Sequence, residues 1–154
     1  MNLTSFVDFE AIRPAMSAAN KRALFQQLAQ AAAQRLGLDA AEVVAAVMER
    51  ERLGSTGFGN GVAIPHGKIE GLRRVYCLVA RLSEPLDYKA VDGIPVDLIF
   101  FLLSPEDAGA EHLKALAAVS RVVRHAPTLE KMRGAYSRDA LAAVLLGVDE
   151  PHAA

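Results

Sequence analysis

One short segment holds the residue types that could do chemistry. The stretch from Gly54 to Lys68, GSTGFGNGVAIPHGK, contains five glycines, two hydroxyl residues and one histidine. Pro65 restricts its own φ and favours an extended conformation at the residue before it, so a short strand should end at His66. Because Gly67 has no side chain, a phosphate or a partner's backbone could approach this imidazole closely. A histidine in such a setting is suited to reversible chemistry near neutral pH.

Phosphoryl transfer is the chemistry that fits this segment best. A neutral imidazole nitrogen can accept a phosphoryl group and pass it on, and the reaction depends mainly on positioning and charge stabilisation. Arg50, at the end of a predicted helix, could meet the negative charge with its planar fork of donors. Ser55 and Thr56 could add hydroxyl donors, and the glycine-rich backbone could add N–H groups. Alternatively, Arg50 is a solvated charge paired with a flanking glutamate, Glu49 or Glu51.

A second histidine could share the site. His112 follows a predicted strand end and a turn, which is where α/β sheets place their sites. We therefore expect it either beside His66 or on a helix surface. Of the other two histidines, His125 is expected to be solvated, and His152 is given no role.

Three other chemistries fit less well. The histidines lack the cysteine partners or the His-x-x-x-His spacing of a zinc site, so we expect no metal and no other cofactor. No G-x-S-x-G nucleophile elbow is present, although Ser55 lies among glycines. The glycines at 57, 59 and 61 precede a predicted strand, whereas a dinucleotide-binding fingerprint opens a helix.

The composition indicates one globular domain. The chain has 154 residues, of which 52% are hydrophobic and 23% charged, with a net charge of −1. This balance argues against nucleic-acid binding through a broad basic face. No apolar run reaches the length of a membrane span, and the first ten residues lack the features of a signal peptide, so a cytoplasmic location is expected. The single cysteine, Cys77, is expected to be buried in a strand.

The hydrophobic pattern predicts an α/β single domain with a small mixed β-sheet sandwiched by α-helices. Two helices should come first, capped by Ser17 and Asp39, and the second should lead into the glycine-rich segment. Near-continuous apolar runs at 75–82 and 96–103 predict strands that are covered on both faces. Helices should follow from residue 109 onward. We place the domain over residues 1–148 and a flexible tail over 149–154.

The quoted segment also resembles a known family. GSTGFGNGVAIPHGK resembles the active-site segment of enzyme IIA domains of the bacterial phosphoenolpyruvate-dependent phosphotransferase system, mannitol/fructose class (type 2). The run from Glu49 to Leu53 matches in kind and spacing, and the segment from Glu111 to Leu113 matches the place of the family's second histidine. The resemblance covers nearly the whole chain and is strongest to the nitrogen-regulatory branch of the family.

The resemblance implies a role for each matching residue. His66 would accept a phosphoryl group, on Nε2, from a phosphorylated HPr-like carrier. His112 would bond the phosphate or steady the ring, and Arg50 would stabilise the charge during transfer. The chain would thus be a phosphotransferase component, a phosphoryl carrier rather than a conventional turnover enzyme. Members of the nitrogen branch regulate partners, such as sensor kinases and potassium transporters, according to phosphorylation state.

Two alternative functions remain open at this point. A sugar-transport IIA subunit would instead pass the phosphoryl group to a IIB domain. A contact-only binding module would share the fold without phosphorylation, although a degenerate module would be expected to lose at least one of the three implied site residues. For docking of a carrier we expect a partly apolar rim, with Phe58, Ile69 and Leu72 as candidates, each of which could equally belong to the core.

Overall fold

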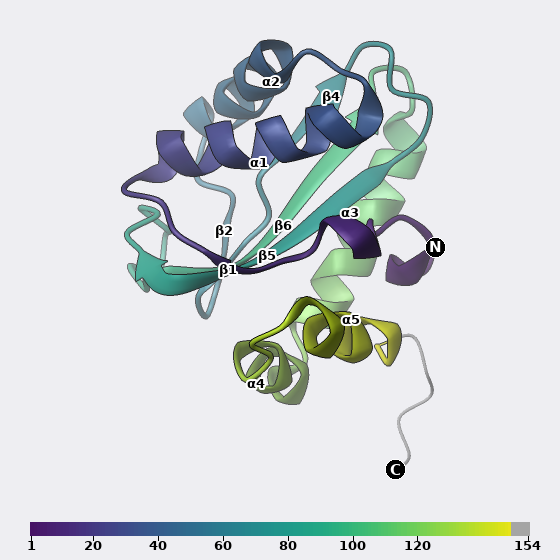
Figure 1. The fold of residues 1–154 in the computed structure, drawn as a ribbon. Coiled ribbons are helices and arrows are strands. Elements are labelled where there is room, and N and C mark those ends of the chain that lie inside the picture. Colours follow the sequence, from purple (N-terminus) through teal and green to yellow (C-terminus); the bar gives the residue numbers. More distant parts are fainter. Residues whose placement is uncertain (149–154) are drawn as a thin grey trace.

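A mixed β-sheet forms the centre of the molecule. The computed structural model describes residues 1–148, so the predicted tail over 149–154 lies outside the described residues. The strand order is β1-β5-β6-β3-β2, and β4 also pairs with β6, next to β3 (Figure 1). β5 and β6 pair antiparallel, whereas β1 runs parallel to β5, and β3 and β4 run parallel to β6. The strands are β1 Arg13–Met16, β2 Gly57–Gly59, β3 Val62–Ala63, β4 His66–Ile69, β5 Tyr76–Leu86 and β6 Val96–Pro105.

Helices cover both faces of this sheet. Helices α1 (Lys21–Leu36) and α2 (Ala40–Arg52) lie on one face, and α3 (Gly109–Val123) lies across the other (Figure 1). Helices α4 (Ala126–Arg133) and α5 (Arg138–Leu146) complete that second layer, together with the short 3₁₀ helix Leu3–Ser5. The second 3₁₀ helix, Phe9–Ala11, leads into β1. The predicted architecture, a mixed sheet between helical layers, is confirmed.

The two central strands feed two separate cores. Successive side chains of a strand point to opposite faces. Cys77 and Val79 of β5 therefore join the core under α3, whereas Tyr76 and Leu78 join the core under α1 and α2. This division explains why both runs read as nearly continuous apolar sequence, as predicted for strands covered on both faces.

The helix ends follow ordinary capping chemistry, with one correction. The Asp39 carboxylate accepts a hydrogen bond from the Ala41 N–H at the start of α2, as predicted. The predicted cap of α1, Ser17, is wrong. It directly follows β1, and the Asn20 side chain instead accepts from the Ala23 N–H at 2.8 Å. Helix α1 ends at Gly37, whose φ of +69° suits glycine.

The glycine-rich segment is more ordered than a loop. β2 and β3 form an antiparallel hairpin, turning through Asn60 and Gly61 at positive φ. β3 and β4 then pair successively with the same edge of β6, and Pro65 lies between them with its carbonyl accepting from the Leu102 N–H at 2.9 Å. The chain thus continues as a strand at His66, where the sequence predicted a strand end.

Candidate active site

His66 is held in one tautomer by the backbone. Its Nδ1 lies 2.7 Å from the Ile64 carbonyl oxygen, which can only accept, so Nδ1 carries the hydrogen. Burial lowers the pKa of His66, and the charge of Arg50 lowers it further, while the Ile64 bond and Glu51 oppose this shift. The ring is therefore neutral at pH 7, with its lone pair on Nε2.

His112 lies beside His66, as expected. The two ring centroids are 5.4 Å apart and the ring planes are inclined by 49°. His112 is 8% exposed, and its Nδ1 lies 2.6 Å from the Ser104 hydroxyl at the end of β6. Burial and the neighbouring His66 and Lys68 lower the pKa of His112 to about 4. Two neutral imidazoles from distant parts of the chain thus share one site at physiological pH.

Arg50 brings a positive charge to this site. Its Nη1 donates to the Gly54 carbonyl at 2.9 Å, which ties the end of α2 to the following loop. The alternative that it pairs with a flanking glutamate is wrong. Glu49 binds Arg52, and Glu51 turns inward to bind Thr56. The charge of Arg50 is one of the causes that lower the pKa of His66.

The two hydroxyl residues make contacts inside the loop. Ser55 Oγ accepts from the Gly57 N–H at 3.1 Å. Thr56 is 8% exposed, and its hydroxyl donates to a carboxylate oxygen of Glu51 at 2.5 Å. These bonds fix the shape of the loop. A phosphate-binding role for Ser55 and Thr56 stays a prediction.

Gly67 has a different role from the one predicted. Its missing side chain was expected to leave room for a phosphate or a partner, but Gly67 is buried against α2. A Cβ atom there would lie 3.3 Å from Ala46 and from a Val47 methyl group. The glycine therefore allows α2 to pack closely on β4. This packing brings Arg50 and Glu51, near the end of α2, close to the histidine.

The expected apolar rim is only partly exposed. Ile69 is 4% exposed, so of its two expected positions, docking rim or core, the structure has the core. Phe58 is 36% exposed, with the Arg124 guanidinium 6.0 Å from its ring centroid. Two exposed leucines were missed: Leu53 directly after α2, and Leu113 next to His112. Their positions in the chain, adjacent to residues of the site, could have indicated them.

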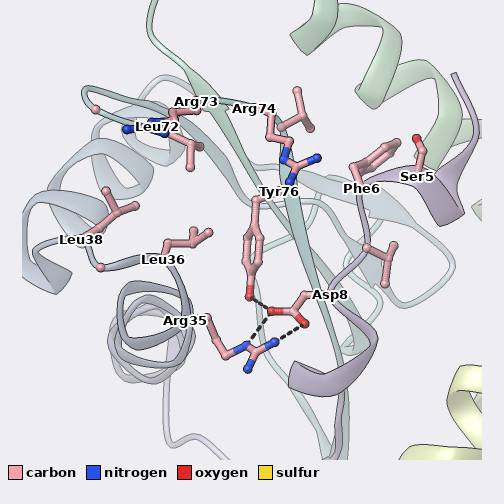
Figure 2. A pocket seen from close by; sticks show the side chains of 14 residues that line it. Ser5, Phe6, Asp8, Arg35, Leu36, Leu38, Leu72, Arg73, Arg74 and Tyr76 are labelled. Atoms are coloured by element: carbon pink, nitrogen blue, oxygen red, sulfur yellow. Dashed lines mark hydrogen bonds and ion pairs between the residues drawn. The ribbon is translucent and has the colours of Figure 1, made fainter.

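A separate pocket lies away from these histidines. Its volume is about 700 Å³, and it is lined in part by Asp8, Arg35, Arg73, Arg74 and Tyr76 (Figure 2). In the wall of this pocket the Asp8 carboxylate accepts hydrogen bonds from the Arg35 guanidinium and the Tyr76 hydroxyl. Within residues 1–148 no group of three or more histidine, cysteine, aspartate or glutamate side chains could hold a metal ion. No helix in this part of the chain is long and apolar enough to cross a membrane.

Comparison with known proteins places this fold in a family. A curated nitrogen regulatory protein from Bradyrhizobium diazoefficiens is 44% identical over 145 residues, covering 94% of this chain and 95% of that protein. The crystal structure of nitrogen regulatory protein IIA-Ntr from Neisseria meningitidis superposes with a TM-score of 0.85 at 34% identity. That match covers 92% of this chain and 97% of the other.

More distant structures share the architecture. The IIA mannitol crystal structure from Escherichia coli matches with a TM-score of 0.75 at 18% identity, covering 90% of this chain and 97% of that one, which shows a common fold. The model of the family described as phosphoenolpyruvate-dependent sugar phosphotransferase system, EIIA 2, matches residues 5–147. The chain therefore belongs to the EIIA 2 family of the phosphoenolpyruvate-dependent sugar phosphotransferase system.

Proposed function

We propose that His66 accepts a phosphoryl group from a phosphorylated HPr-like carrier, and that the phosphorylation state of this protein controls partner proteins. One observation carries the proposal: the Nδ1–H of a neutral His66 is fixed on the Ile64 carbonyl at 2.7 Å, which leaves Nε2 as the nucleophile. His112 and Arg50 lie near this ring. The regulatory role is supported by relatives named nitrogen regulatory protein.

The proposed reaction needs little covalent machinery. The Nε2 lone pair attacks phosphorus, the carrier's P–N bond breaks, and its electron pair returns to the carrier's imidazole. Positive charge developing on the His66 ring is stabilised by the Ile64 carbonyl that accepts from Nδ1. The oxygens of the transferred phosphoryl group carry negative charge, which the Arg50 guanidinium is suited to stabilise.

We assign a complementary role to His112. Its Nδ1 accepts from the Ser104 hydroxyl in the tautomer that leaves a hydrogen on Nε2. That Nε2–H donates to a phosphoryl oxygen once His66 is phosphorylated. Because the pKa of His112 is about 4, this donor is neutral at pH 7 and leaves the charge compensation to Arg50.

The partners follow from the added charge. Phosphorylation changes the charge of the site by nearly −2, so a partner can distinguish the two forms by repulsion or by pairing with arginine. We propose that such partners include sensor kinases or potassium transporters, and that the relay operates in the cytoplasm. The exposed Leu53, Leu113 and Phe58 supply apolar contact area for the carrier.

The test is intact mass after incubation with phosphoenolpyruvate, enzyme I and an HPr-like carrier. The wild type should gain one acid-labile phosphate, and His66→Ala should gain none. His125→Asn is the control, because His125 precedes α4 and lies outside the proposed site. Phosphate uptake by His66→Ala, or no uptake by the wild type from a carrier shown to be charged, would refute the proposal. Loss of the phosphate only when sugar and membranes are added would favour the sugar-transport alternative.

A further inference from the structure

The carboxylate of Glu51 is buried behind the proposed site. Its side chain is 6% exposed. It accepts from the Thr56 N–H at 2.6 Å and from the Thr56 hydroxyl at 2.5 Å. The Tyr88 hydroxyl donates to the same carboxylate at 2.6 Å. The Lys21 ammonium lies 3.7 Å from it and 4.1 Å from the Tyr88 ring centroid, which provides the opposite charge that a buried carboxylate requires.

These contacts continue to the reacting imidazole. The carbonyl of Thr56 accepts from the Ile64 N–H at 3.0 Å. The carbonyl of Ile64 in turn accepts from His66 Nδ1 at 2.7 Å. Glu51 thus holds the backbone of Thr56, Thr56 holds the backbone of Ile64, and Ile64 holds the ring. Three hydrogen bonds, linked through the backbones of Thr56 and Ile64, therefore join a buried carboxylate to the histidine.

Only a carboxylate fits the start of this series. The Thr56 N–H, the Thr56 hydroxyl and the Tyr88 hydroxyl all donate, and an ionised carboxylate is an acceptor at both oxygens. A glutamine in its place would direct an NH₂ group at one of these donors. It would also replace charge-assisted hydrogen bonds with weaker neutral ones. The loop would then lose the contact that sets its position.

We propose that Glu51 is a positioning residue that, through Thr56 and Ile64, holds His66 in the Nδ1–H tautomer and directs phosphorylation to Nε2. The inference rests on the proposed function for its catalytic consequence. Its structural consequence, the tautomer of His66, can be measured without any phosphorylation.

The test compares Glu51→Gln with a matched control, Glu49→Gln. Glu49 lies on the same helix, but it is exposed and pairs with Arg52. The first readout is the ¹⁵N chemical shifts of the His66 ring in the unphosphorylated protein, and the second is the rate of phosphoryl transfer from a charged HPr-like carrier. Glu51→Gln should raise the Nε2–H tautomer to a readily detected fraction and slow transfer about 10- to 100-fold. Glu49→Gln should match the wild type in both.

The outcomes separate positioning from a purely structural role. A folded Glu51→Gln protein with a wild-type tautomer and rate would overturn the inference, as would equal losses in the Glu49→Gln control. If Glu51→Gln does not fold, Glu51→Asp carries the test, because the shorter side chain keeps the charge but withdraws the carboxylate from the Thr56 N–H and hydroxyl. An unchanged His66 tautomer in a folded Glu51→Asp protein would then overturn the inference. A shifted tautomer together with a wild type that takes up no phosphate would instead refute the proposed function alone.

Discussion

Asp8 and Glu51 are held in nearly the same way at opposite ends of α1. Asp8 accepts from the Tyr76 hydroxyl at 2.8 Å and from Arg35, in the last turn of α1, at 2.9 Å. Glu51 accepts from a tyrosine hydroxyl at 2.6 Å and lies near the lysine that begins α1. The two basic residues are 14 positions apart, which is roughly 21 Å along the helix.

The two clusters differ in what the carboxylate also binds. Asp8 forms a two-point pair with the guanidinium and lines an open pocket, so it fastens the N-terminal segment to α1 and β5 (Figure 2). The cation beside Glu51 is the more distant Lys21, at 3.7 Å, and the carboxylate also accepts two hydrogen bonds from Thr56. Thr56 is in turn linked through Ile64 to His66. The same combination of groups therefore serves stability in one place and, in our proposal, the orientation of His66 in the other.

The largest expected difference concerns two arginines: Arg35 in the Asp8 cluster, and Arg50, which precedes Glu51 in the chain and lies close enough to influence the pKa of His66. Arg50→Lys should slow phosphoryl transfer about 10- to 100-fold, because an ammonium cannot present the planar fork of donors that suits phosphoryl oxygens. Arg35→Lys changes the same residue type beside Asp8 and should leave transfer unchanged. Single-turnover rates from a charged carrier measure both. Equal rates for the two variants would return Arg50 to the role of a surface charge.

Removing the charge of Asp8 should affect stability alone. Asp8→Asn exchanges a carboxylate for an amide between two donors, which should lower the free energy of unfolding by about 1–2 kcal/mol. Chemical denaturation measures this loss. The rate of phosphoryl transfer and the His66 tautomer should stay at wild-type values, and a change in either would show that the two clusters are not separate.

As the pH falls, the stability contributed by His112 should be lost before the stability contributed by Asp8. The pKa of His112 falls from 6.5 to about 4 on folding, so the folded state binds fewer protons than the unfolded state. Its stabilising contribution is complete above pH 6.5 and is lost as the pH falls to about 4. Burial opposes a lower pKa at Asp8, but Arg35 and Tyr76 outweigh it, so the pKa lies below 3.8 and this contribution is lost at lower pH.

Denaturation midpoints across this pH range test the order. His112→Gln should flatten the dependence between pH 6.5 and 4, leaving the smaller part due to His66, and Asp8→Asn should flatten the dependence below pH 3.8. An unaltered slope between pH 6.5 and 4 in His112→Gln would contradict the assignment of a buried neutral ring.

The smallest expected difference concerns the two tyrosines. Tyr76→Phe and Tyr88→Phe each remove one hydroxyl donor to a carboxylate, so each should lower stability by about 1 kcal/mol. Only Tyr88→Phe should also slow phosphoryl transfer, by a few-fold, because it loosens Glu51. Thermal denaturation and the transfer assay together separate the two effects.

The sequence predicted the parts of the fold that depend on local chemistry. Asp39 caps its helix as expected, because a side-chain oxygen two residues before a free N–H is a local feature. His112 was expected either beside His66 or on a helix surface because it follows a predicted strand end and a turn, and the structure has the first arrangement. Ser17 was mistaken for a cap because the sequence does not reveal that β1 runs up to it.

Long-range contacts could not be read from the sequence in the same way. Glu51 lies in an alternating run of glutamates and arginines that is typical of a solvated helix end. Its burial depends on Tyr88, 37 positions later, and on Lys21 at the start of another helix. The packing of α2 on Gly67 was likewise missed, because a glycine in a sequence indicates a close approach but does not identify the group that approaches.

The close packing at Gly67 makes the spacing between α2 and β4 set how strongly the charges of α2 act on His66. A single methyl group there would lie 3.3 Å from Ala46 and Val47, so α2 would have to shift outward by a small distance. Arg50 lowers the pKa of His66 and Glu51 raises it, and both would then be displaced together. The spacing between one helix and one strand is therefore a way to change the pKa of His66 while every charged group is kept.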